Sequence, residues 1–330
     1  MAVDPFLISD TCIYHEAAPG DGGNHVVAQW WLSPDVTIVG APMGNVLGGT
    51  NNTINVIPRR KSGGCNLPQG TEINPDGSVA VAVELYVCVP GPVIKPNDAT
   101  QAKSLGTQVA NLQSGAASTV PFSFVTTNVP NTPDGPGHKC LIARSYPGII
   151  APDPNSLTHL PDDQHYAQHN ICIQICGGPG AARVPGECQF AVATANPDRE
   201  RPSRVTLRLE ADTRPNRTVL DALLPRLRQV PAFQRLARSA PPRFDLRLPD
   251  FPDAQGHFDG GHGCLGLLFG KKSKPRYSVN IQLSPDQVTH FRVRTDLSRS
   301  SFGDAHIFHL TQAGEDGRVQ GGVTVVFVVG

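Results

Sequence analysis

The chain has 330 residues, enough for two domains of common size. Its 33 glycines, its 31 prolines and a charged fraction of only 17% exclude a predominantly helical protein and favour many short strands joined by turns. The formal net charge is zero, and no segment approaches the roughly 18–20 apolar residues that a membrane-spanning helix needs.

The N-terminal segment, residues 1–24, does not have the pattern of a standard secretory signal. It lacks both a basic start and a long apolar stretch. The compartment therefore stays open at this point. The protein is kept in the cytoplasm, it is exported by another route, or its signal has been removed.

Apolar runs separated by clusters of Gly, Pro, Asn and Asp predict a series of strands within residues 25–178. In the longest run, the odd-numbered residues from Val79 to Val87 are all apolar, whereas the residues between them are mixed. One face of this strand is therefore expected to meet an opposite sheet, as in a Greek-key sandwich. Strands are expected at 25–32, 35–40, 52–60, 78–91, 118–127, 138–147 and 169–176.

The order of these motifs resembles a known type of module. The stretches "SPDVTIVG", "GGTNNTINVIPRR", "VAVELYVCVPG", "GHKCLIARSYPG" and "DDQHYAQHNICIQ" are similar to those of immunoglobulin-like (CARDB-like) adhesion modules of bacterial surface and secreted proteins. The resemblance covers about residues 25–178. It implies an Ig-like β-sandwich and a role in adhesion or binding.

Residues 187–330 are expected to form a second β-sandwich that carries a helical insertion. Leucines and other apolar residues recur every three or four positions in Arg217–Ala240, which predicts an amphipathic helix kinked or split at Pro225 and Pro231. The fold class is therefore mostly β, with two Ig-like Greek-key sandwiches. Strands of the second domain are expected at 188–197, 203–213, 243–248, 276–283, 287–297, 304–310 and 321–330.

Charge and composition both place a domain boundary near residues 177–186. By residue count, residues 1–180 carry a net charge of about −6 and the remainder about +6. The Gly/Pro-rich stretch "GGPGAARVPG" lies at this change of sign. Opposite charges permit attraction between the halves or head-to-tail between copies, although drift in surface charge would give the same count.

The eight cysteines include no CxxC pair, so zinc ribbons and thioredoxin-like motifs are unsupported. Cys88, Cys140 and Cys172 lie on strands of the same expected sandwich, where a bridge is possible. We expect at least one disulfide if the protein is extracellular and none if it is cytoplasmic.

The stretch Asp162–Cys176 combines two histidines and two cysteines in a pattern that suggests metal ligands. However, His165 and His169 are about 13 Å apart if the segment is a strand, and only a helix would bring them together. Alternation favours the strand. It is expected to turn the isoleucines at 171, 173 and 175 to the core, and Cys172, Gln174 and Cys176 outward or toward a neighbour.

The loop Gly256–Cys264 is the other candidate metal site. Four of its side chains could act as ligands, and imidazole with thiolate suits zinc. These residues do not follow the spacing of a structural zinc site, so a glycine-rich loop with exposed polar groups remains the alternative. The candidate ligands are His257, Asp259, His262 and Cys264.

Motifs for nucleophilic catalysis and nucleotide binding are absent, and the sequence argues against nucleic-acid binding. The sequence contains no GxSxG, no P-loop and no Rossmann fingerprint, so no cofactor is predicted. Arginines are frequent between residues 199 and 247, but interleaved acidic residues and few aromatics argue against nucleic acid. A protein partner or another copy of the chain is the expected user of these arginines.

The sequence therefore predicts a non-enzymatic structural or binding protein that acts through β-sandwich edges and loops, in a larger assembly or in adhesion. The alternative is a metal-dependent hydrolase or carbohydrate-active accessory protein that uses the His257–Cys264 loop. A third possibility is a carrier in which the Arg217–Ala240 helix serves as a lid.

Overall fold

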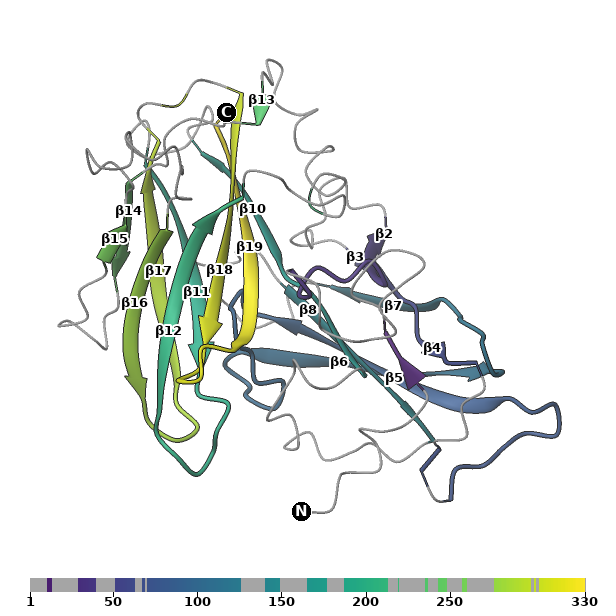
Figure 1. Ribbon diagram of the computed structural model, residues 1–330. Helices are drawn as coiled ribbons and strands as arrows, with labels where there is room; N and C mark the ends of the chain where they lie inside the picture. The colour runs from purple at the N-terminus through teal and green to yellow at the C-terminus, as the bar shows by residue number, and fades with distance from the viewer. Residues whose placement is uncertain are drawn as a thin grey trace, which may run out of the picture. The chain divides into compact units, whose positions relative to one another are not determined.

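Strands dominate every part of the chain that the computed structural model describes (Figure 1). The chain folds into two compact units. The first unit comprises Met1–Val89, Ile94–Asn131 and His138–Asn170, and the second comprises Pro90–Val93, Thr132–Gly137 and Ile171–Gly330. The structure describes residues 11–13, 29–39, 51–62, 67–68, 70–125, 140–148, 165–176, 187–212, 219, 235–236, 243–247, 257–259, 276–297, 300 and 303–329.

The first unit contains two larger sheets and a short ladder. One sheet has the order β2 (Val36–Val39), β3 (Asn51–Val56), β7 (Val120–Val125). The other has the order β6 (Ala102–Leu112), β5 (Val79–Cys88), β8 (Cys140–Pro147), β9 (Tyr166–His169). The short ladder pairs β1 (Thr11–Cys12) with β4 (Arg59–Arg60).

The core of the first unit forms where apolar faces of these sheets meet. The predicted face of β5 is confirmed, because Val81, Val83, Leu85 and Val87 are fully buried in one cluster. Side chains of β3, β7 and β8 join them, including Ile54. Period-two alternation thus places one set of each strand's side chains inside, as the sandwich interpretation requires.

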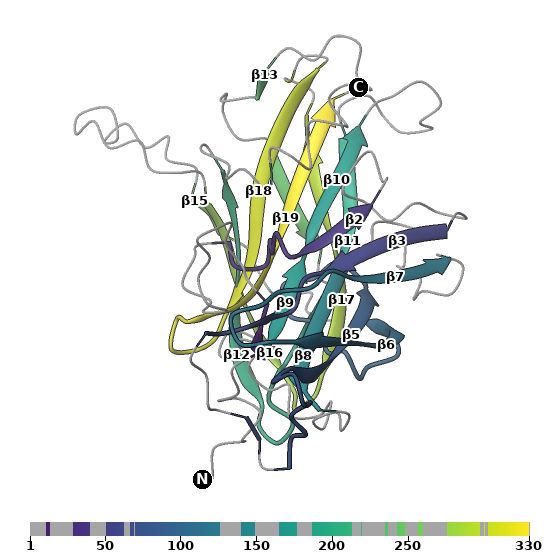
Figure 2. The ribbon, with the colours of Figure 1, turned by 90° about the vertical axis from the view of Figure 1, so that its right-hand side faces the viewer.

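The second unit has a seven-stranded and a three-stranded sheet. The larger runs β10 (Ile171–Cys176), β19 (Val319–Val329), β18 (Asp304–Ala313), β12 (Ser203–Ala211), β16 (Arg276–Leu283), β15 (His257–Asp259), with β13 (Arg235–Leu236) beside β18. Figure 2 shows β10, β19 and β18 side by side. The smaller runs β11 (Glu187–Ala195), β17 (Val288–Asp296), β14 (Arg243–Arg247).

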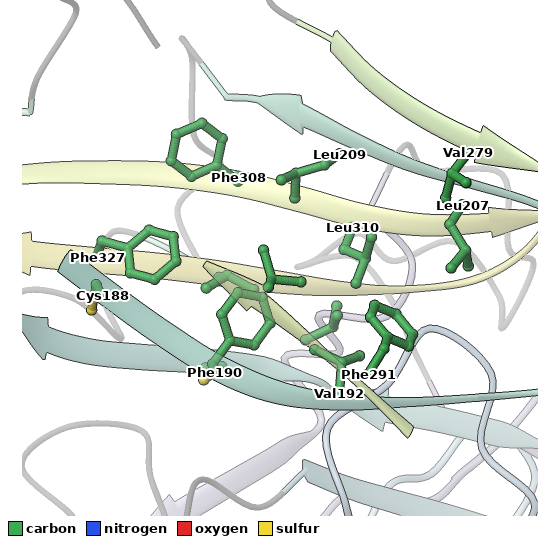
Figure 3. Close-up of a cluster of buried hydrophobic side chains, with 14 of the residues drawn as sticks. Cys188, Phe190, Val192, Leu207, Leu209, Val279, Phe291, Phe308, Leu310 and Phe327 are labelled. Carbon is green, nitrogen blue, oxygen red and sulfur yellow. The ribbon is translucent and has the colours of Figure 1, made fainter. Parts of the chain in front are cut away.

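Aromatic and aliphatic side chains from both sheets fill the core of the second unit (Figure 3). Phe327 of β19 lies 5.7 Å from the Phe190 ring of β11 and 6.1 Å from the Phe308 ring of β18, measured between ring centroids. Contact between rings of opposite sheets adds specific geometry to the burial of apolar area. The prediction of a mostly β fold built of sandwiches is confirmed.

The predicted helix at Arg217–Ala240 lies almost entirely outside the described residues. Of the described residues of this segment, Val219 is helical, whereas Arg235–Leu236 form a two-residue strand parallel to β18, so the helical prediction is wrong at 235–236. Among the described residues, no helix has the length and apolar character needed to cross a membrane.

Two strand predictions in the first half also need correction. Within the expected strand 25–32, Gln29–Trp31 form a turn that is closed by the Leu32 amide donating to the Gln29 carbonyl at 3.0 Å. The tryptophan at position 30 packs edge-on against Trp31, and both are buried. The strand prediction is therefore wrong at 29–31, where buried aromatic rings produced the apolar signal, and residues 25–28 lie outside the described residues.

The segment expected to close the first sandwich is divided between the two units. β9 pairs with β8, whereas β10 pairs in parallel with β19. The side chains of Cys172 and Cys176 belong to the core of the second unit. Of the two placements that the sequence left open, outward or toward a neighbour, the outward one is therefore wrong. Ile171 and Ile173 are buried as well, so both faces of β10 are covered and alternation could not assign the inner one.

The segment Pro90–Val93 packs closely within the second unit. The Ala193 amide donates to the Pro90 carbonyl at 2.8 Å, beside the edge of β11. A Cβ atom on Gly91 would lie 2.1 Å from the Ala193 carbonyl oxygen, and one on Gly321 would lie 1.7 Å from the Pro92 carbonyl oxygen. Glycine at these two positions allows the backbones to approach each other.

Candidate functional site at an open sheet edge

The predicted metal ligands are only partly described. His257 and Asp259 lie on β15, where their Cα partners are Ser278 and Arg276 of β16. The other two, His262 and Cys264, lie outside the described residues. Within the described ranges, no three His, Cys, Asp or Glu side chains gather as a metal site requires. Zinc binding by this loop stays a prediction.

One disulfide joins two strands of the second unit. Cys176 at the end of β10 bonds to Cys188 in β11, with their Cα atoms 5.6 Å apart, a normal separation for a disulfide. The pairing itself was not predicted. Of the cysteines expected to lie close together, Cys88 and Cys140 are Cα partners across β5 and β8, whereas Cys172 lies on β10 of the second unit.

A buried histidine in the second unit has a partner at each ring nitrogen. His309 on β18 lies 2.7 Å through Nε2 from the Asp212 carboxylate and 2.9 Å through Nδ1 from the Thr324 hydroxyl. The Asp212 carboxylate can only accept, so Nε2 is the donor in that contact. Thr324 is fully buried, which denies a substrate access to its oxygen. No local pattern in the sequence signals this cluster.

A second buried polar cluster lies on the face of β5, β8 and β9 opposite the first unit's core. Arg144 forms an ion pair with Glu84 at 2.9 Å and donates to the Tyr166 hydroxyl at 2.9 Å. The Tyr86 hydroxyl donates to the Glu84 carboxylate at 3.0 Å, and the guanidinium carbon lies 5.0 Å from the centre of the Tyr146 ring. Burial raises the pKa of Tyr146 to about 12, so this phenol keeps its proton at neutral pH.

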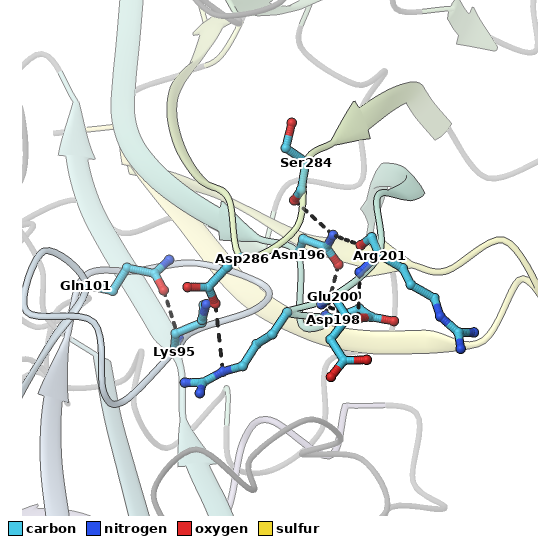
Figure 4. A network of polar contacts seen from close by, with 9 residues as sticks. Lys95, Gln101, Asn196, Asp198, Glu200, Arg201, Ser284 and Asp286 are labelled. Carbon is cyan, nitrogen blue, oxygen red and sulfur yellow. Dashed lines mark hydrogen bonds and ion pairs between the residues drawn. The ribbon is translucent and has the colours of Figure 1, made fainter.

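The turns at one end of the second unit form a hydrogen-bonded network (Figure 4). The side-chain amide of Asn196 donates to the backbone carbonyls of Arg201 at 2.7 Å and Ser284 at 2.9 Å. The Asp198 carboxylate accepts from the backbone N–H of Glu200 at 2.8 Å and from that of Arg201 at 3.0 Å. Side-chain bonds of this kind hold turns in shape, so the network gives the loops a defined surface.

The open edge of the first unit is the feature best suited to bind a partner. β6 ends its sheet, and β5 is the only described strand that pairs with it. Most side chains between Lys103 and Val109 are exposed, and Val109 itself is 55% exposed. Gly106, with φ of 100°, marks a bulge in β6 that bends the start of the strand. After the bulge, Thr107–Leu112 forms a regular edge without charge or proline.

Two hydrogen bonds show which backbone groups of this edge are directed outward. The Gly148 amide donates to the Ala80 carbonyl, so even-numbered residues of β5 bond toward β8. Odd-numbered residues of β5 therefore bond toward β6, in agreement with the bond from the Val89 amide to the Gln101 carbonyl. By register, the backbone groups of residues 107, 109 and 111 are directed away from β5.

Sequence comparison gives no family: no protein-family model matches the chain, and neither does any curated protein. The resemblance to CARDB-like modules therefore remains a prediction.

Similar solved structures include three surface-protein domains. The collagen adhesin of S. aureus is 9% identical over 89% of this chain and 92% of that chain, with a TM-score of 0.25. The collagen-binding domain of the Erysipelothrix rhusiopathiae surface protein RspB is 10% identical over 86% and 92%, with a TM-score of 0.19. The C-terminal domain of Streptococcus pyogenes AspA is 9% identical over 96% and 99%, with a TM-score of 0.22. Likeness at this level carries no argument about function.

Proposed function

We propose that the protein is a non-enzymatic binding protein that acts through the edges and loops of its sandwiches, with a protein or further copies of itself as the partner. The observation that carries this proposal is the open, uncharged edge Thr107–Leu112 of β6. An edge of this kind presents backbone donors and acceptors that an added strand can pair with.

The two buried polar clusters, around His309 and Arg144, support a role in stabilising the fold and not a role in catalysis. In the His309 cluster, each ring nitrogen lies within hydrogen-bonding distance of a buried partner. In the Arg144 cluster, the charges pair with each other and with tyrosine hydroxyls. Buried polar groups that bind one another in this way stabilise the sandwich and are not available to bind a substrate.

Proline at position 109 tests the edge. Val109→Pro removes an outward N–H but no donor of the β5–β6 ladder, so the sheet is expected to survive. The matched control Val109→Thr keeps the N–H and the strand propensity. We expect the mass measured by light scattering to rise with concentration in the wild type and in Val109→Thr, and to stay monomeric in Val109→Pro.

Hydrogen exchange supplies the second measurement. Association through β6 should protect the amides of Thr107, Val109 and Asn111 at high protein concentration, because these groups then pair with the added strand. A mass that rises equally in all three proteins, without protection of these amides, would contradict pairing at β6. A wild type that stays monomeric throughout would contradict binding to further copies.

A further inference from the structure

The edge Thr107–Leu112 of β6 has the composition and the backbone pattern needed to pair with a copy of itself. It contains no charged residue, so two such edges meet without repulsion between like charges. Its outward backbone groups belong to alternate residues, Thr107, Val109 and Asn111. Each of these residues directs one N–H and one C=O away from β5, the donor and the acceptor that an antiparallel partner needs.

The pattern of outward groups restricts the register of such a pair. When a two-fold axis relates two antiparallel copies, the same patch serves on both sides and the contact closes as a dimer. Outward groups must face outward groups, so odd-numbered residues stand opposite odd-numbered residues. Within Thr107–Leu112, only one register of this kind pairs all three outward residues. It places Val109 opposite Val109 of the second copy, and Thr107 opposite Asn111 of the second copy.

The side chains fit this register on both faces of the sheet. Val109 is 55% exposed in the single chain, and its neighbour by register on β5 is the buried Ala82. In the pair, Val109 meets Val109 of the second copy, so an apolar row crosses the junction. On the face that belongs to the core of the first unit, Gln108 stands opposite Ala110 of the second copy. The register therefore covers an exposed apolar side chain and brings no charges of one sign together.

We infer that β6 pairs antiparallel with β6 of a second copy about a two-fold axis at Val109, which joins their four-stranded sheets into one continuous sheet. This inference rests on the proposed function and adds the partner, the direction and the register. Each pair of opposed outward residues exchanges two hydrogen bonds. The bulge at Gly106 ends the regular edge on one side, so pairing is confined to Thr107–Leu112.

Cysteine cross-linking of the full-length chain tests the register. Val109→Cys places two thiols opposite each other, with Cα atoms roughly 5.5 Å apart, within the roughly 7 Å that a disulfide spans. Thr107→Cys is the matched control, because it lies on the same edge but its two copies are four residues out of register, roughly 13 Å apart along the strands. With oxidised glutathione as the oxidant, we expect Val109→Cys to give at least tenfold more cross-linked dimer than Thr107→Cys on a denaturing gel without reductant. The wild type, which has eight cysteines of its own, sets the background.

A double variant and a mass measurement complete the test. Thr107→Cys combined with Asn111→Cys should restore the cross-link that neither single variant gives, and it replaces Val109→Cys if that variant fails to fold. A mass that rises with concentration in light scattering, while Val109→Cys and the double variant cross-link no better than Thr107→Cys, overturns this register and leaves the β6 edge as the binding site. A wild type that stays monomeric overturns pairing with a second copy, and the proposed function then requires a different protein at this edge.

Discussion

Arg144 is a buried charge whose removal should be costly to the first unit. Its side chain is 2% exposed, and that of its partner Glu84 is 12% exposed. Burial by itself would lower the pKa of Arg144, but Tyr166 and Glu84 favour its charged form and the pKa is raised. We expect Arg144→Met to lower the free energy of unfolding by about 3–5 kcal/mol, because the Glu84 carboxylate is left uncompensated. Urea denaturation followed by fluorescence measures the change.

The double variant separates the charge from the packing. Glu84→Gln combined with Arg144→Met leaves no buried charge in the cluster, so it should be more stable than Arg144→Met alone. A double variant whose loss equals the sum of the two single losses would show that the ion pair is not coupled.

Two buried histidines should make stability depend on pH. Burial lowers the pKa of His169 on β9 and of His306 on β18. The unfolded chain takes up protons below about pH 6.5, whereas the folded state takes them up only at a lower pH. Stability is therefore unaffected well above pH 6.5. It falls as the pH drops below that value, by up to about 1.4 kcal/mol per pH unit for each histidine.

His169→Leu tests this dependence, because leucine fills the site without titrating. Urea unfolding of the variant and of the wild type is compared at pH 7.5 and pH 5.5. The loss of stability between the two pH values should be smaller in the variant. Equal losses would mean that His169 contributes nothing to the pH dependence.

At the residue scale, sequence reasoning located individual side chains better than their partners. Alternation placed the inner face of β5 correctly because neighbouring residues suffice to define it. The Asp212–His309 contact joins residues 97 positions apart, and the disulfide joins Cys176 to Cys188 across a junction between strands. Partners of this kind depend on strand order and register, which no local pattern encodes.

At the scale of elements, the strand that carries the proposed function is the one that sequence reasoning missed. Nearly all other long strands were expected, because apolar runs such as that of β5 mark a strand that buries one or both faces. β6 is exposed along most of its length and contains Gly, Ser, Thr and Gln. An edge strand packs little of its surface against the core, so its sequence shows weak periodicity. The turn-forming residues on either side, at 96–98 and 114–115, were the available signal.

Close backbone packing at Gly321 should tolerate no side chain. A Cβ atom at this position would lie 1.7 Å from the Pro92 carbonyl oxygen, and backbone cannot yield as a flexible side chain can. We expect Gly321→Ala to destabilise the second unit by at least about 1–3 kcal/mol in thermal denaturation. Gly314→Ala is the control, since its Cβ would meet only the ends of the Gln320 and Asp316 side chains. Similar losses in both variants would contradict this explanation.

At the scale of the whole molecule, the chain folds into two compact units, and most of the second unit begins at Ile171. The proposed domains, 25–178 and 187–330, leave residues 179–186 between them, and these lie outside the described residues. The strand Ile171–Cys176 nevertheless belongs to the second unit. The sequence could not place this strand, because β10 follows β9 after a single residue, Asn170, and no glycine or proline separates the two strands.

Limited proteolysis at the junction should therefore have an unusual outcome. We expect cleavage within the Gly/Pro-rich stretch 177–186, but the Cys176–Cys188 disulfide spans this stretch and holds the two fragments together. The cleaved protein should run as one band on a denaturing gel without reductant and as two bands after reduction. Under native conditions the fragments should stay together even when reduced, because β10 pairs with β19 over six residues. Two bands without reductant would show that the disulfide is not formed, and release of fragments from the reduced native protein would show that β10 does not hold them.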